Sequence, residues 1–289
     1  MKLALGTAQF GLNYGVANID GRTSLSEVAR IIHRARAAGM DTLDTAAAYG
    51  GSEHVLGEIG VNGWKVVSKV PPMPDGASDG KQWVHDYVQQ SLARLRVARL
   101  EGLLLHSATD LLKVQGSGLA KGLQDMQAEG LVGQIGFSIY SPQDLPDLLQ
   151  VLRPNLIQAP FSVFDQRLAQ SGWLDRLSDA GVEIHARSIF LQGLLLMTRA
   201  RRPAFFDRWN ELWRRWETLV DAHGGNALAV CLGFVRAQPG IARIVLGVDN
   251  LVHLEQLLAT WQEAVPVHGT AELSCVDLEL VEPFRWKVA

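Results

Sequence analysis

Eight short apolar segments, each followed by a stretch with helical periodicity, are the feature that most restricts the fold of this chain. The segments are rich in Val, Ile and Leu or are bounded by turn residues. They are Lys2–Leu5, Met40–Asp44, Lys65–Val70, Leu100–Leu105, Gly133–Ser138, Leu156–Ala159, Val182–Ala186 and Ala242–Leu246. Because a helix carries the chain back across the sheet after each strand, consecutive strands are predicted to be parallel.

The helical segments between these runs carry recognisable start and stop signals. Thr23 or Ser24 can cap a helix that ends before Gly39, and Ser52 is predicted to cap a shorter helix that ends at Ile59. Further helices are predicted over 83–95, 111–129, 142–152, 173–180, 226–237 and 251–261.

Two architectures accommodate this alternation, a doubly wound sheet and a closed barrel. A doubly wound dinucleotide-binding sheet favours a GxGxxG turn after the first strand, and GTAQFGLNYG at that place lacks this spacing. A (β/α)₈ barrel needs eight strand-helix units in about 250 residues, and the chain provides them within 289. The sequence therefore predicts one α/β domain over residues 1–289, a (β/α)₈ TIM barrel.

Two long segments are predicted to be loop insertions at the rim of this barrel. Pro71–Gly80 follows the third strand and is rich in Pro and Gly. Leu191–Asn226 follows the seventh strand and carries an apolar and aromatic stripe at helical spacing. The stripe consists of Phe205, Trp209, Leu212, Trp213, Trp216 and Leu219. Such a stripe is more often a packing face than a ligand cage, but its place after a strand leaves a contribution to a lid open.

The composition argues against several classes of partner. The formal net charge of -3 gives no basic surface for nucleic acid or an anionic membrane. No apolar stretch reaches the roughly 18 residues of a membrane span, and the N-terminal apolar run is too short for a signal peptide. Cys231 and Cys275 show no CxxC spacing, so reduced thiols and a cytoplasmic location are expected.

Four ionisable side chains fall at or just after the ends of predicted strands. Asp44 ends the second strand, Tyr49 follows it, Lys69 lies near the end of the third, and His106 ends the fourth. Each has a structural explanation: a cap, an interface aromatic, a lysine that reaches solvent and a hydrogen-bonded core histidine. In a (β/α)₈ barrel, however, the active site lies at the carboxyl ends of the strands, so all four would share one rim.

Together these four residue types predict proton-transfer chemistry. A lysine in an apolar strand is costly to bury unpaired, and Asp44 on the neighbouring strand would compensate Lys69. A tyrosine hydroxyl, with an ordinary pKa of about 10, is expected to become a better acid beside an ammonium group. His106 would orient or hydrogen-bond a carbonyl oxygen.

The chain resembles the aldo-keto reductase superfamily over nearly its whole length. The resemblance lies in GTAQFG, DTLDTAAAYG with GSEHVLGE, VVSKV, LLLHS, GQIGFS, NLIQAPFS and IVLGVDNLVHLEQLL. It implies a barrel that binds a nicotinamide dinucleotide without a Rossmann motif and transfers hydride to the carbonyl of an aldehyde or ketone. It further implies Tyr49 as general acid, Lys69 and Asp44 as groups that tune it, and His106 as the group that orients the substrate.

The resemblance also implies residues for the nicotinamide half of the cofactor. Residues that match the turn beneath the cofactor are Gly6, Thr7 and Ala8. Ser138 and Gln158 match the groups that hold the carboxamide, whereas Ile139 stands where relatives usually have Asn. Arg187 stands where many relatives place an aromatic ring against the nicotinamide. It would stack on that ring or reach the pyrophosphate.

For the adenosine half, the resemblance points to the loop and helix after the eighth strand. The matching residues are Gly247, Val248, Asp249, His253 and Gln256. A carboxylate at Asp249 would repel a 2′-phosphate and accept hydrogen bonds from a ribose diol. NADP(H) and NAD(H) therefore both remain open as cofactors.

The opening GTAQFGLNYGVAN and the closing EPFRW are similar to a subgroup of these reductases encoded with surface-polysaccharide genes. That similarity implies a sugar or sugar-derived substrate, which Phe10, Tyr14, Phe161 and the Trp-rich segment would surround. Each of these aromatic residues has a packing explanation as well.

Two other functions are weighed against a carbonyl reductase. A barrel that has lost catalysis and serves as a binding or regulatory subunit would explain the altered cofactor loop. A metal-dependent lyase or hydrolase would need clustered ligands, and His106 and His185 have no paired carboxylates beside them, so no metal is expected. The expected partner is a small carbonyl compound, and the expected state is a monomer or a weak homo-oligomer.

Overall fold

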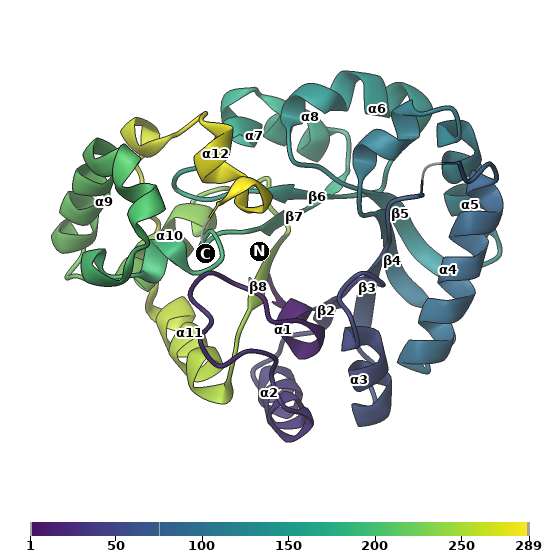
Figure 1. The fold of residues 1–289 in the computed structure, drawn as a ribbon, viewed down its shortest axis with the longest axis horizontal. Coiled ribbons are helices and arrows are strands. Elements are labelled where there is room, and N and C mark those ends of the chain that lie inside the picture. Colours follow the sequence, from purple (N-terminus) through teal and green to yellow (C-terminus); the bar gives the residue numbers. More distant parts are fainter. Residues whose placement is uncertain (1, 75, 288–289) are drawn as a thin grey trace.

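The computed structural model describes residues 2–74 and 76–287, and a closed barrel of eight parallel strands lies at its centre (Figure 1). The strands are β1 (Lys2–Gly6), β2 (Thr42–Asp44), β3 (Lys65–Val70), β4 (Leu100–Leu105), β5 (Val132–Ser138), β6 (Leu156–Pro160), β7 (Glu183–Arg187) and β8 (Arg243–Gly247). Each strand pairs with its neighbours in chain order, and β1 also pairs with β8, which closes the barrel. The predicted (β/α)₈ barrel is confirmed.

Helices surround the barrel and connect its strands (Figure 1). They are α1 (Ala8–Gly11), α2 (Leu25–Ala37), α3 (Ser52–Ile59), α4 (Gly80–Leu95), α5 (Gly116–Ala128), α6 (Leu145–Val151), α7 (Arg167–Gln170), α8 (Trp173–Asp179), α9 (Asn210–Ala222), α10 (Ala227–Arg236), α11 (Leu251–Glu263) and α12 (Leu278–Val281). Of the two candidate caps for α2, Ser24 takes the position, and its side chain accepts from the Glu27 amide.

Two predicted helices begin later than expected. The helix expected over 111–129 starts at Gly116, after a separate 3₁₀ turn over Ala108–Leu112. The chain folds back tightly there, since a Cβ added at Gly116 would lie 1.8 Å from the Leu111 carbonyl oxygen. The helix expected from residue 142 opens with a 3₁₀ turn, Pro142–Asp144, ahead of α6.

The predicted role of Ser52 as a helix cap is wrong. Gly51 takes the cap position of α3, and the buried Ser52 hydroxyl donates to the Thr7 carbonyl oxygen at 2.9 Å. A buried polar side chain needs such a partner more than the exposed end of a helix does. The bond joins α3 to the turn that follows β1.

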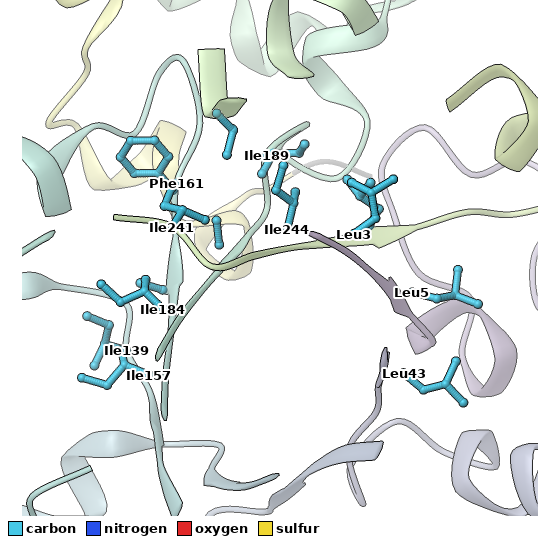
Figure 2. Close-up of a cluster of buried hydrophobic side chains, with 14 of the residues drawn as sticks. Leu3, Leu5, Leu43, Ile139, Ile157, Phe161, Ile184, Ile189, Ile241 and Ile244 are labelled. Atoms are coloured by element: carbon cyan, nitrogen blue, oxygen red, sulfur yellow. The ribbon is translucent and has the colours of Figure 1, made fainter. Parts of the chain in front are cut away.

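Apolar side chains pack mainly between the strands and the surrounding helices. Those that Figure 2 shows pointing away from the barrel interior include Leu5, Leu43, Ile157, Ile184 and Ile244. Inside the barrel, Val67, Leu104 and Leu156 form a small separate cluster. Because successive side chains of a strand point to opposite faces, the remaining inward positions are available to polar groups at the two ends of the barrel.

The pairing register makes several of the predicted site residues neighbours on adjacent strands. Gly6 is the partner of both Asp44 and Gly247, and Ser138 is the partner of Gln158. Register partners on parallel strands face the same side of the sheet. The residues that end their strands, and therefore lie at the carboxyl end of the barrel, are Gly6, Asp44, Ser138, Arg187 and Gly247.

The two segments predicted as insertions differ in structure. Residues 71–74 and 76–79 join β3 to α4 without regular helix or strand, and residue 75 lies outside the described residues. The segment after β7 forms three 3₁₀ turns, Leu194–Leu196, Arg199–Arg201 and Ala204–Trp209, and then α9.

The aromatic stripe on this second segment packs against the barrel domain core. Trp213 and Trp216 are buried, with ring centroids 5.0 and 5.9 Å from that of Phe164. The Trp213 indole donates to the Phe206 carbonyl oxygen at 2.9 Å.

Among the described residues no single helix is long and apolar enough to cross a membrane. Residues 204–222 and 227–236 reach that length and apolarity only when taken together, and the two helical segments are bent by 90° relative to each other.

Candidate active site

A buried ion pair between β2 and β3 forms the base of the candidate site. Lys69 Nζ donates to Asp44 Oδ1 at 2.7 Å, and the two side chains are only 1% and 3% exposed. Nζ also donates to the Thr45 carbonyl oxygen at 2.9 Å. The second Asp44 oxygen accepts from Gln158 Nε2 at 2.7 Å. Both charges therefore have partners, as buried charges require.

The Lys69 ammonium is held in a setting that makes it a weaker base than usual. Burial lowers its pKa, and the ion pair with Asp44 opposes that effect without reversing it. The spatial arrangement that we expected from the sequence, a cation on the third strand neutralised by an acid on the second, is present.

Tyr49 places its hydroxyl above this pair, on the loop between β2 and α3. Its hydroxyl oxygen accepts from Lys69 Nζ at 3.5 Å, and the ammonium lies 5.0 Å from the ring centroid. Burial, followed by the charge of Asp44, raises the pKa of Tyr49. The pKa of Tyr49 is therefore raised, not lowered as expected, in this state of the protein, and the cation that opposes the rise is Arg187. The phenol stays protonated at neutral pH.

His106 follows β4 and contacts the Tyr49 ring edge to face, with centroids 5.7 Å apart. Burial lowers the pKa of His106 to about 4, and the nearby charges of Lys69 and Arg187 act in the same direction. The imidazole is thus neutral at pH 7. Its Nδ1 is buried and has no hydrogen-bond partner within the described part of the chain. A buried ring nitrogen without a hydrogen-bond partner is unusual in a folded protein.

The end of β1 fixes the backbone of the catalytic strand β2. Thr7 is buried, and both its amide and its hydroxyl donate to the Asp44 carbonyl oxygen, at 3.0 and 2.9 Å. Close packing continues beside it, because a Cβ at Gly11 would lie 1.8 Å from the Tyr49 carbonyl oxygen. Thr7 and α1 therefore hold Asp44 and the Tyr49 loop in place, and Ala8 is a buried residue of α1.

Ser138 and Gln158 lie side by side as register partners on β5 and β6, and both are buried. The Gln158 amide nitrogen is bound to Asp44, which the sequence did not indicate, and this leaves the amide oxygen as an acceptor. Ile139, in the place of the usual Asn, is buried in the outer core.

Arg187 lies at the carboxyl end of β7, and its guanidinium is over the Tyr140 ring at 4.4 Å. Nη2 donates to the Ile139 carbonyl oxygen at 2.9 Å, and Nη1 donates to Ser188 Oγ at 3.2 Å. No carboxylate of residues 2–74 or 76–287 lies within ion-pairing distance of it. The guanidinium is a fixed and partly exposed cation at the mouth.

The loop after β8 carries acidic groups at the start of α11. Asp249 contacts His253 through Oδ2 and Nδ1 at 3.4 Å, and this raises the pKa of His253. The Glu27 carboxylate from α2 accepts from the Leu251 amide at 2.7 Å. Val248 is buried, so its backbone alone faces the loop.

The remaining residues that were predicted to contact the cofactor or the substrate are divided between the surface and the packed core. Gln256 lies exposed on the second turn of α11, and Gly247 is exposed at the end of β8 beneath the Gln9 side chain. Phe10 and Phe161 are fully buried and belong to the packing core, Phe161 stacking on Phe234 with centroids 5.2 Å apart. Tyr14 is 38% exposed, and its hydroxyl accepts from Gln192 Nε2 at 3.3 Å.

Sequence reasoning missed the groups that the C-terminal segment brings to the rim. Phe284 contacts the Tyr140 ring edge to face, with centroids 4.7 Å apart. Arg167 anchors this region, since it donates to Glu282 Oε1 at 3.2 Å and to the Tyr140 carbonyl oxygen at 3.1 Å. Tyr140 stands two residues after Ser138 at the end of a strand, and that position alone could have drawn attention to it.

The two histidines considered as metal ligands have different neighbours. His106 contacts Tyr49, whereas His185 Nε2 lies 2.9 Å from Oε1 of Glu183, the first residue of β7. Within the described residues there is no group of three or more His, Cys, Asp or Glu side chains arranged to hold a metal ion.

A parallel eight-stranded barrel with a proton-bearing phenol, a buried ion pair and a neutral imidazole at its carboxyl end has the layout of an enzyme site. The model of the aldo/keto reductase family matches residues 2–268. This chain belongs to the aldo/keto reductase family, and it is an oxidoreductase of that kind.

Solved structures show the same fold at low sequence identity. One is an aldo-keto reductase from Bacillus halodurans in its holo form, 19% identical, with a TM-score of 0.76, covering 99% of this chain and 95% of that one. Another is a glycerol dehydrogenase from Gluconobacter oxydans, 21% identical, with a TM-score of 0.70, covering 97% of this chain and 92% of that one. A search of curated proteins gave no match.

Proposed function

We propose that this chain transfers hydride between a nicotinamide dinucleotide and the carbonyl group of an aldehyde or ketone. The observation that carries the proposal is the Lys69–Asp44 pair, buried directly beneath the Tyr49 hydroxyl with neutral His106 beside it. When bound, the dinucleotide supplies the hydride. The protein supplies the proton and the polar environment for the carbonyl oxygen.

Each of these residues has a chemical part in carbonyl reduction. Tyr49 holds a proton on its hydroxyl and gives it to the oxygen as negative charge develops there. Lys69 then stabilises the tyrosinate, because its ammonium already donates toward that oxygen. His106 is neutral at pH 7, so an imidazole N–H can donate to the carbonyl oxygen without bringing a second full charge.

The residues beside this centre fit a pyridine carboxamide. The Ser138 hydroxyl is a donor and the Gln158 amide oxygen an acceptor, and they are neighbours on adjacent strands. The bond from Gln158 Nε2 to Asp44 fixes which end of the amide is free. The same bond makes Gln158 a link between cofactor position and the proton donor.

Acidic groups at the adenosine end favour NAD(H) over NADP(H). Glu27 accepts from the first amide of α11 and from the exposed Arg30, both at 2.7 Å, and Asp249 contacts His253. Two carboxylates at a helix start would repel a 2′-phosphate. Fluorescence titration should give a lower Kd for NADH than for NADPH in the unaltered protein. Glu27→Gln combined with Asp249→Ser should narrow that difference about tenfold, and an unchanged ratio would reject NAD(H) selection by these residues.

Replacement of Tyr49 by Phe tests the proposed reaction. Turnover of an aldehyde should fall by about 10²- to 10⁴-fold, the usual contribution of a positioned acid, while the Kd for NADH stays within about twofold. Tyr87→Phe on α4, a partly buried tyrosine that contacts Trp83, is the matched control and should keep full turnover. Retained activity in the Tyr49 variant would refute the assigned acid.

The same titration separates this proposal from a catalytically silent binding or regulatory protein. An unaltered protein that binds neither NADH nor NADPH and reduces no aldehyde would favour the second function. The altered loop after β8 is the observation behind that alternative, because it departs from the usual cationic cofactor loop.

A sugar-derived carbonyl compound is one candidate substrate. The aromatic faces that support it are Tyr14 and Tyr140 at the mouth, together with Phe284 from the C-terminal segment. Such faces suit the C–H surfaces of a sugar ring as well as an apolar aldehyde.

A further inference from the structure

We propose that Arg187 and the aromatic side chains around it form a subsite for a carboxylate carried by the carbonyl substrate. The inference rests on the function proposed above and names the class of substrate, an aldehyde or ketone that also bears a carboxylic acid. Arg187 would then determine specificity and would not serve the cofactor.

Arg187 is a rigid cation without an ionic partner among the residues that the structure describes. Its two hydrogen bonds go to neutral oxygens, those of Ile139 and Ser188, and one face is covered by the Tyr140 ring. A guanidinium has five N–H donors in a planar fork that matches a carboxylate. The remaining donors are thus held in place for an acceptor that the described residues do not provide.

The mouth as a whole carries a positive charge that the protein does not balance within its described residues. Lys69 is matched by Asp44, and His106 and Tyr49 are neutral at pH 7. Arg187 therefore leaves the site with one excess positive charge, which a single carboxylate would balance. A phosphate monoester carries about −2 and would overcompensate it.

Arg187 lies near the reacting groups. Its Nη2 donates to the carbonyl oxygen of Ile139, which follows Ser138, the register partner of Gln158. Its charge also acts on Tyr49 and His106. A carboxylate bound there would lie on the same small molecule as the carbonyl group that contacts Tyr49. The pyrophosphate of a dinucleotide is the competing ligand, and the experiment below separates the two.

The surrounding rings hold the guanidinium in place. Tyr140 lies beneath it, and the Phe284 ring contacts the Tyr140 ring. Arg167 and Glu282 fix both rings through the carbonyl of Tyr140 and the C-terminal segment. Tyr140 and Phe284 are 36% and 60% exposed, so they support the guanidinium without sealing it from solvent.

The test compares succinic semialdehyde with its methyl ester, which differ in one negative charge. In the unaltered protein, kcat/KM with saturating NADH should favour the acid by about ten- to a hundredfold, as expected for hydrogen bonds to a charged group. Arg187→Met should abolish that preference, mainly through KM for the acid, and leave the Kd for NADH within about twofold. Arg187→Lys should restore part of it, since it keeps the charge and loses the planar fork.

Arg176→Met on α8 is the matched control, because Arg176 is an exposed arginine that also lies over an aromatic ring, at 5.2 Å from Trp173. It should retain the preference for the acid. If Arg187→Met does not fold, competitive inhibition of the unaltered protein by succinate, compared with its dimethyl ester, gives the same answer.

Two results would overturn the proposal. One is an equal kcat/KM for acid and ester in the unaltered protein, which leaves carbonyl reduction intact and removes only the carboxylate subsite. The other is an Arg187→Met variant in which the Kd for NADH rises while the acid-to-ester ratio is unchanged, which would assign Arg187 to the cofactor. Loss of all activity in the unaltered protein would instead reject the function itself.

Discussion

The two ends of the barrel interior are both polar, but they differ in whether their charged side chains have partners of opposite charge. At the amino end, Arg243 donates to Glu183 at 3.0 Å and to Asp41 at 2.6 Å, and His185 lies 2.9 Å from the same Glu183. At the carboxyl end, Lys69 is paired with Asp44, whereas Arg187 has no carboxylate partner within residues 2–74 and 76–287. The apolar cluster of Val67, Leu104 and Leu156 belongs to the interior of the same barrel.

This difference separates a structural use of buried charge from a functional one. A charge that stabilises the fold is fully paired, since removal of one partner leaves the other without compensation. A charge that serves a ligand is held rigidly and left unpaired. An orphaned ring nitrogen does not distinguish the two ends, because Nδ1 of His185 lacks a hydrogen-bond partner within the described residues just as Nδ1 of His106 does. The comparison can be tested at either end.

Removal of the charge on Lys69 should have the largest effect. Lys69→Met is expected to lower aldehyde turnover by about 10²- to 10⁴-fold, because the tyrosinate of Tyr49 loses its stabilising cation. The variant also leaves Asp44 buried without a counter-ion, so the double change with Asp44→Asn is the control for folding. Recovered stability with turnover still lost, measured by thermal unfolding and aldehyde reduction, sharpens the comparison. Turnover recovered in the double variant would contradict the assigned role.

Removal of an arginine should affect stability at one end only. Arg243→Met should lower the free energy of unfolding by about 3 kcal/mol, the lower end for breaking a buried pair, because Asp41 and Glu183 are 31% and 28% exposed. Arg187→Met should change it by less than about 1 kcal/mol, since no carboxylate is left behind. Denaturant unfolding measures both. Equal losses would break the distinction between the two ends.

The two ends should also titrate in different pH ranges, with smaller effects on stability. Burial lowers the pKa of His106 to about 4, so the unfolded chain, with a pKa of 6.5, binds more protons between these values and stability rises with pH there. The hydrogen bond with His185 is the main cause that lowers the pKa of Glu183 from 4.5 to about 2, so stability rises with pH in that lower range. In both cases the stability is lost as pH falls.

Unfolding measured from pH 3 to pH 8 checks this separation. His106→Gln should flatten the curve between about pH 4 and 6.5, and Glu183→Gln should flatten it below about 4.5. A Glu183 variant that alters only the upper range would show that the two ends are not independent.

Much of the fold could be predicted from the sequence, because strand and helix periodicities agree with turn signals at almost every junction. The third and fourth strands have the predicted bounds, Lys65–Val70 and Leu100–Leu105. The errors occur where a side chain that looks like part of a local motif bonds instead to a residue far away in the sequence. Ser52 looks like a helix cap, yet its hydroxyl serves Thr7, which is 45 residues away.

For the candidate site, the sequence predicted which residues come together but not the pKa of Tyr49 or the contribution of the C-terminal segment. Asp44, Tyr49, Lys69 and His106 come together as expected, because strand ends in a barrel share one rim. The direction of the Tyr49 pKa was not foreseen, since it depends on burial and on Asp44 rather than on the nearest cation. The contribution of Phe284 could not be inferred, because nothing in the local sequence shows that the C-terminal segment returns to Tyr140.

The bond from Gln158 to Asp44 has a consequence for engineering this protein. It makes the proton-donating centre depend on β2, β3 and β6 at once, across 114 residues of sequence. A graft of surface loops from another barrel would leave that three-strand frame intact, whereas a hybrid that exchanges half-barrels between β3 and β6 would divide it. New substrates should therefore be easier to obtain by rebuilding the connections above the strands than by recombining the strands themselves.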